Sequence, residues 1–134
     1  MSPSPRPGMG AIVWPGGATF RVWAPHARAV AVRGSFDGWS DDGIALAPDG
    51  DGSGGTWSAD VPGVAPGAEY RFTIRTADGD LSRLDPYARQ VTSSVGNAVV
   101  YDPAAFDWGQ TDFRMPDWHA LVIYEMHIGT FAAR

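Results

Sequence analysis

The acidic run of residues 49–60, DGDGSGGTWSAD, has residue types at a spacing that could bind a calcium ion. The ligand and turn positions of a calcium-loop template would fall on Asp49, Asp51, Ser53, Gly54 and Asp60. The last position is Asp, however, where the template needs a longer, bidentate Glu, and the alternation in TWSADV predicts a strand where the template needs a helix. We therefore favour an acidic hairpin loop over a metal site.

Three histidines and one turn serine are the other groups that could do chemistry. His26, His119 and His127 show no ligand spacing, and the chain has no Cys to complete a mixed metal cluster. Ser35, in RGSFDG, lacks the strand-to-helix elbow and the paired base of a nucleophile. No Gly-rich loop opens a helix to hold phosphate. These patterns predict neither a metal site nor a cofactor.

The turn GSFDGWS, residues 34–40, places an indole between two predicted strands. An exposed Trp39 on such a turn could stack against the apolar face of a sugar ring, and an inward-facing Trp39 would anchor the core. The residues alone leave both interpretations open.

The candidate residues named above lie among short runs in which apolar and polar residues alternate. Turns rich in Gly, Asp and Pro separate these runs. The runs AIVW, ATFRVWAP, RAVAVRGSF, GTWSADV, AEYRFTIRT, LSRL and NAVVYD each place apolar residues on one face. Such runs are typical of antiparallel strands with one buried and one wet face. The inward residues are predicted to be Phe20, Val22, Ala24, Val30, Val32, Trp57, Ala59, Val61, Tyr70, Phe72 and Ile74. Residues 10–101 are thus predicted to form an all-β, immunoglobulin-like β-sandwich.

The two ends of the chain differ from this central region. Residues 1–9, MSPSPRPGM, have three Pro and little to bury, so we expect a disordered, flexible tail. Residues 102–120 break the alternation but keep four large rings, which predicts an ordered linker whose aromatics pin it to a surface. Residues 121–134, LVIYEMHIGTFAAR, read as a further strand that the sandwich does not need.

Composition limits the partners and the compartment. With 134 residues, 44% of them apolar, the chain can bury one sizeable core. All ten basic residues are Arg, and fifteen acids bring the net charge to -5, which argues against nucleic acid as a partner. There is no apolar run of about 18 residues to span a membrane. The start lacks the apolar stretch of a secretory leader, so we expect a cytoplasmic location.

Five blocks of the sequence, taken in order, resemble a known family. ATFRVWAPHARAVAVRGSFDGWS, followed by GAEYRFTI, LDPYAR and VYDP, is similar to the family 48 carbohydrate-binding module, which precedes the catalytic barrel of many α-glucan-active enzymes. LVIYEMHIGTF resembles the first barrel strand of glycoside hydrolase family 13. The arrangement, over about residues 10–131, is similar to the N-terminal region of bacterial 1,4-α-glucan (glycogen) branching enzymes and of malto-oligosyltrehalose trehalohydrolases.

The resemblance implies a sugar site. It assigns ring stacking to Trp39 and hydrogen bonding of sugar hydroxyls to Asn97, in SSVGNAVV. A second stacking ring, found in the best binders, would fall near Leu81, where this chain has none. The resemblance therefore implies weak or absent glucan binding, with the module then serving to brace the barrel.

The resemblance also implies that the parent enzyme is a retaining one, which needs two carboxyl groups about 5 Å apart across the scissile bond. Those groups belong to later barrel strands, and none of the fifteen acids of this chain matches a catalytic position. Glu125 and His127 receive no catalytic role, and 121–134 would be the start of a truncated (β/α)₈ barrel. The expected parent is a branching enzyme. Alternatives are a trehalohydrolase, a debranching enzyme, a free-standing glycogen-binding module and a purely structural sandwich.

Overall fold

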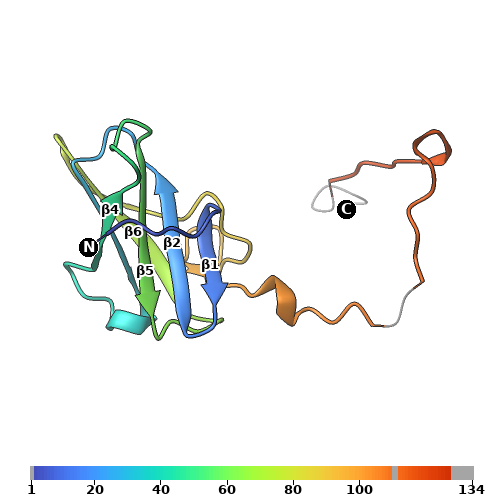
Figure 1. The fold of residues 1–134 in the computed structure, drawn as a ribbon, viewed down its shortest axis with the longest axis horizontal. Coiled ribbons are helices and arrows are strands. Elements are labelled where there is room, and N and C mark those ends of the chain that lie inside the picture. Colours follow the sequence, from blue (N-terminus) through green and yellow to red (C-terminus); the bar gives the residue numbers. More distant parts are fainter. Residues whose placement is uncertain (1, 110–111, 128–134) are drawn as a thin grey trace, which may run out of the picture.

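The computed structural model describes residues 2–109 and 112–127, and within them eight strands and three short 3₁₀ turns form the regular structure (Figure 1). The strands are β1 (Gly10–Trp14), β2 (Gly17–Trp23), β3 (Ala29–Gly34), β4 (Ile44–Pro48), β5 (Thr56–Pro62), β6 (Glu69–Thr76), β7 (Gly79–Arg83) and β8 (Ala98–Val99). The 3₁₀ turns are η1 (Ser35–Asp37), η2 (Pro103–Ala105) and η3 (Trp118–Ala120).

The strands pair antiparallel in the order β1-β2-β5-β4-β3-β6-β7, with β8 also paired to β6. This continuous path curls into two layers, which we call layer A (β1, β2, β5) and layer B (β3, β6, β7, β8). β4 joins the two, because Ile44–Leu46 pair with β3 and Ala47–Pro48 pair with β5. The predicted all-β sandwich is confirmed, although β4 itself was not among the predicted strands.

The core lies between the layers and is built around three rings. Phe20 of layer A meets Tyr70 of layer B edge-on, with ring centroids 4.9 Å apart, and Tyr70 meets Phe72 at 5.8 Å. Register explains the inward set, since residues directly opposite in an antiparallel pair share a face. Phe20 pairs with Ala59, for example, and Val32 with Phe72. All of the predicted inward residues are buried except Trp57 and Ile74, which pack partly buried against the core.

A buried hydroxyl and carboxyl pair ties the loop after β7 to this core. The Tyr70 hydroxyl donates to Asp85 Oδ2, and the backbone N–H of Tyr87 donates to Asp85 Oδ1 at 2.8 Å. Both Tyr70 and Asp85 are almost fully buried. Burial raises the pKa of Asp85 despite these hydrogen bonds, and burial together with the neighbouring Asp85 raises the pKa of Tyr70.

Asp85 should give the stability a pH dependence that Asp85→Asn removes. A carboxyl whose pKa is raised by folding contributes stability that is fully present below its unfolded pKa and is lost as the pH rises through its folded pKa. Since folding raises the pKa of Asp85 from its ordinary value of 3.8, we expect wild type to gain stability relative to Asp85→Asn as the pH is lowered from about 7 to about 4. Urea titrations of both proteins across this range measure the difference. A difference that shrinks or stays constant with falling pH would contradict the assignment.

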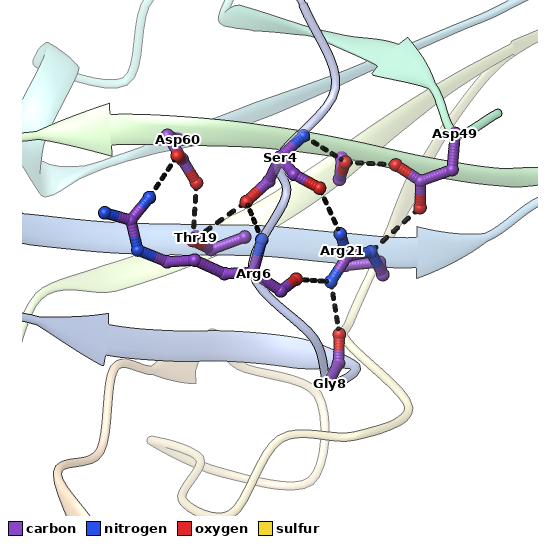
Figure 2. Close-up of polar contacts among 8 residues, drawn as sticks. Ser4, Arg6, Gly8, Thr19, Arg21, Asp49 and Asp60 are labelled. Atoms are coloured by element: carbon purple, nitrogen blue, oxygen red, sulfur yellow. Dashed lines mark hydrogen bonds and ion pairs between the residues drawn. The ribbon is translucent and has the colours of Figure 1, made fainter.

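The first residues do not form the predicted flexible tail. Residues 4–8, which we call the N-terminal strap, cross the outer face of layer A (Figure 2). Ser4 N–H donates to Ser58 Oγ at 2.9 Å, and Arg6 forms an ion pair with Asp60. The strap is short and polar, but it meets a polar surface on which backbone groups find hydrogen-bond partners. Low apolar content therefore did not make it disordered.

Arg21 of β2 is the centre of these contacts. Its Nε donates to Asp49 Oδ2 at 2.8 Å, and its two terminal nitrogens donate to the carbonyl oxygens of Ser4, Arg6 and Gly8. The side chain points to the outer face, yet the residue is only 8% exposed because the strap covers it. The prediction of a wet outer face is thus wrong for the middle of layer A.

The segment after β8 runs away from the sandwich in Figure 1. Its large side chains are exposed, among them Phe106, Trp108, Phe113 and Trp118. Phe106 and Trp108 meet edge-on, with ring centroids 4.8 Å apart. Residues 121–127 form no helix or strand, and residues 128–134 lie outside the described part of the chain. It remains a prediction that residues 102–120 form a linker pinned by its aromatic side chains, and that residues 121–134 form the first strand of a barrel. No helix in the described ranges has the length and apolar content to cross a bilayer.

Candidate binding site

Trp39 lies in the turn after η1 with a backbone conformation that L residues seldom adopt. It is the one non-Gly residue with a positive φ, 61°, in the described ranges. Asp37 stabilises this conformation, because its Oδ1 accepts from the N–H groups of Gly34 at 2.9 Å and Trp39 at 3.0 Å. Arg33 Nη2 donates to the Trp39 carbonyl oxygen at 3.2 Å. The backbone that carries the half-buried indole is therefore held by two side chains.

Asn97 lies at the end of the 91–97 loop, just before β8, and its backbone is also fixed. Its N–H donates to Thr92 Oγ1 at 2.9 Å, and its carbonyl oxygen accepts from Thr92 N–H at 2.9 Å. Its side-chain Nδ2 donates to Glu69 Oε2 at 2.7 Å. The loop thus presents Asn97 in a single orientation beside the first residue of β6.

Glu69 connects the two predicted residues. Its N–H donates to Ser35 Oγ in η1 at 3.1 Å, and its carboxylate accepts from Asn97. The turn that bears Trp39 and the loop that bears Asn97 therefore flank the start of β6, so the structure brings them to one end of layer B. Ser35 acts here as a hydrogen-bond acceptor.

Sequence reasoning missed Glu69 because its partners depend on strand pairing. In the structure Glu69 shares the outer face of β6 with Arg71. That it meets Asn97 follows from the pairing of Glu69 with Val99 and of Tyr70 with Ala98, which brings β8 alongside β6. No local signal in the sequence encodes this pairing.

Two arginines lie directly opposite each other on the outer face of layer B. Arg33 pairs in register with Arg71, an arrangement in which like charges repel. They lean apart. Arg33 reaches the Trp39 carbonyl, whereas Arg71 donates to Ser82 Oγ at 3.0 Å and to the Gly96 carbonyl oxygen. Each arginine thereby holds one of the two loops that bear the candidate residues.

Leu81 occupies the strand position at which a second ring was considered. It pairs with Ile74, so it shares the inward-facing side of layer B, and it is 38% exposed at the edge of the sandwich. Arg71 and Glu69 lie on the opposite side of β6. Leu81 therefore offers no aromatic platform beside Trp39 and Asn97.

The acids of the calcium-like run have other partners (Figure 2). Asp49 binds Arg21 and Ser58, Asp60 binds Arg6 and Thr19, and Asp51 accepts from the Ser53 N–H at 2.9 Å. Burial acts to raise the pKa of Asp60, but hydrogen bonds from Ser4 and Thr19 and the charge of Arg6 lower it overall. The loop between β4 and β5 is the predicted hairpin loop.

The remaining candidates are three histidines and one glutamate outside this site. All four residues are exposed; His26 lies between β2 and β3, whereas His119, Glu125 and His127 lie in the segment after β8. Over residues 2–109 and 112–127, no three His, Cys, Asp or Glu side chains form a group that could hold a metal ion. The end of layer B that bears the Trp39 turn, Asn97 and Glu69 is therefore the best-supported site, because an indole and oxygen acceptors are the groups that a neutral polyhydroxyl ligand requires.

Comparison with known proteins identifies the family. The model for carbohydrate-binding module 48 (isoamylase N-terminal domain) matches residues 8–88, more than half of the chain. The chain belongs to this family. Membership in the module 48 family agrees with the predicted immunoglobulin-like sandwich and confirms the resemblance noted in the sequence.

The curated relatives of this module 48 chain are much longer proteins. A 1,4-alpha-glucan branching enzyme GlgB of Corynebacterium jeikeium is 37% identical over 130 residues, which cover 92% of this chain and 18% of the enzyme. The GlgB of Aromatoleum aromaticum is 39% identical over 124 residues, covering 86% and 19%. The chain thus spans about a fifth of the length of the curated relatives it matches.

A solved structure supports the same family. A pullulanase type I of Bacillus subtilis, complexed with maltose, superposes with a TM-score of 0.65 at 27% identity, over 79% of this chain and 14% of that one. The chain is therefore homologous to an N-terminal portion of these much longer α-amylase-family enzymes.

Proposed function

We propose that this chain is the N-terminal module of a retaining α-glucan-active enzyme, that the parent enzyme is a 1,4-α-glucan branching enzyme of glycogen metabolism, and that the module binds α-glucan through Trp39 and Asn97. The observation that supports glucan binding is the convergence of the Trp39 turn and the Asn97 loop on Glu69. The indole supplies an apolar face for a glucose ring, and the amide oxygen accepts from a sugar hydroxyl.

Glucan binding should depend on Trp39. We expect the wild-type chain to be retarded by glycogen in affinity electrophoresis, and Trp39→Ala to bind at least about tenfold more weakly, because the loss of one stacked ring removes much of a small interface. Trp118→Ala is the matched control, since Trp118 is a far more exposed indole, at 81%, outside the sandwich. If glycogen does not retard the wild-type chain, glucan binding by this module is wrong.

A second candidate function is support of the following domain, which two observations favour. The chain lacks a second ring at Leu81, and the segment after β8 exposes Phe106, Trp108, Phe113 and Trp118 to solvent. Apolar patches of this kind usually mark an interaction surface. In this proposal the parent's own barrel covers them, and the module braces the barrel whether or not it binds glucan.

The identity of the parent enzyme is open to a direct assay. A full-length protein carrying this module should create α-1,6 branch points in amylose if it is a branching enzyme, whereas a debranching enzyme would remove them and a trehalohydrolase would release trehalose. The cytoplasmic location stays a prediction.

A further inference from the structure

The orientation of the Asn97 amide follows from the chemistry of Glu69. An ionised carboxylate can only accept hydrogen bonds, so the amide must direct its NH₂ group toward Glu69 and its oxygen away from it. The structure has this arrangement, with Nδ2 donating to Glu69 Oε2 at 2.7 Å. The Asn97 Oδ1 oxygen is thereby available as a hydrogen-bond acceptor. A free amide, by contrast, could rotate and present either group to a ligand.

Glu69 has a second oxygen that the described residues leave unused. Within residues 2–109 and 112–127, the hydrogen bonds of the Glu69 side chain involve Oε2 alone. No arginine of these ranges forms an ion pair with it, although Arg71 lies two residues along on the same face. Arg71 instead binds Ser82 and the 95–96 carbonyl oxygens. This half-buried carboxylate therefore has spare capacity to accept a hydrogen bond from a ligand.

We propose that Glu69 is a specificity-determining residue of the glucan site, which fixes the Asn97 amide oxygen as an acceptor and supplies Oε1 as a second acceptor beside it. This inference rests on the proposed glucan-binding function. Two adjacent acceptors match two neighbouring hydroxyl groups of one glucose unit, each of which donates one hydrogen bond. The partner class is thus a neutral sugar with a free vicinal diol.

The charge of Glu69 strengthens this recognition. Hydrogen bonds to an ionised acceptor are stronger than those between neutral groups. Glu69→Gln is the informative change, because the Gln oxygen can still accept from Asn97 Nδ2, while an NH₂ group then replaces the free acceptor. Glu69→Ala removes both the positioning contact and the acceptor. The two variants therefore separate orientation of Asn97 from direct contact with the sugar.

Isothermal titration of maltoheptaose into the 134-residue chain tests the proposal. We expect Glu69→Gln to bind about tenfold more weakly than wild type, as for the loss of one charged hydrogen bond. Glu69→Ala should bind at least as weakly, and adding Asn97→Ala to it should reduce affinity by less than Asn97→Ala does in wild type, because the two residues act as a unit. Asp80→Asn, an exposed acid on the neighbouring strand, is the matched control and should bind as wild type does.

Thermal unfolding of each variant separates ligand contact from a structural role. Glu69→Gln should unfold at the wild-type temperature. Wild-type affinity in Glu69→Gln, or a lowered unfolding temperature that accompanies the lost affinity, would overturn the role given to Glu69. If wild type does not bind maltoheptaose, or if Trp39→Ala binds as tightly as wild type, it is the proposed function that fails.

Discussion

Arg21→Met is expected to lower the free energy of unfolding by about 3 kcal/mol, as for the loss of one partner from a buried charge pair. Met keeps the apolar stem but donates no hydrogen bond. The substitution leaves Asp49 without its cation and the carbonyl oxygens of Ser4, Arg6 and Gly8 without their donor. Because domains of this size are stable by only about 5–15 kcal/mol, urea denaturation should show a clear shift of the midpoint.

Arg75→Met is the matched control for Arg21→Met. Arg75 lies on layer B with its side chain 45% exposed, and its ion-pair partners Asp42 and Asp80 are exposed too. Its loss should change the free energy of unfolding by less than about 1 kcal/mol. A chain that begins at Gly10 should lose about as much unfolding free energy as Arg21→Met does. The truncated chain that also carries Arg21→Met should be little less stable than either variant alone. Equal effects of Arg21→Met and Arg75→Met would show that the strap contributes no stability.

Phe20→Ala should be the more damaging change, with a loss of about 4 kcal/mol. Phe20 is fully buried and joins the layers, since its ring contacts Tyr70 at 4.9 Å and Phe36 at 5.4 Å between centroids. Truncation leaves a cavity between the two layers. The layers cannot move together freely to fill it, because one continuous path of paired strands joins them. Chemical denaturation followed by Trp fluorescence measures the loss.

Phe106→Ala provides the comparison for Phe20→Ala. Phe106→Ala removes the same atoms, but Phe106 is 54% exposed, and its ring meets only Trp108, edge-on, among the described rings. Its removal should change the free energy of unfolding by about 0.5 kcal/mol or less. A large loss in Phe106→Ala would mean that the segment after β8 packs on the sandwich in solution.

Alternation in the sequence was sufficient to predict the sandwich and its core. Runs such as AEYRFTIRT have one apolar residue at every second position, and Tyr70 and Phe72 are indeed buried. β4 was not predicted because Ile44–Pro48 is short, ends in Pro and lies among Gly and Asp residues that resemble a loop. Its strand conformation depends on β3 and β5, which pair with it from both sides.

The strap shows a second limit of local patterns. Composition predicted disorder for residues 1–9 because they have few apolar side chains. The stabilising contacts are instead made by residues far away in sequence, chiefly Arg21, Ser58 and Asp60. The binding site has the same character. Trp39 and Asn97 could be named from the resemblance, whereas Glu69 between them became visible only with the register of β6 and β8.

β4 also sets how the chain can tolerate insertions. Leu46 faces the core opposite Val30, and the next residues already belong to the ladder with β5. One inserted residue within Ile44–Pro48 would reverse the facing of every later side chain of the strand and misalign both layers at once. The acidic loop of residues 49–55 follows directly and can lengthen without moving either ladder. Length variation among natural variants of this sandwich should therefore gather in that loop and be absent from the five residues before it.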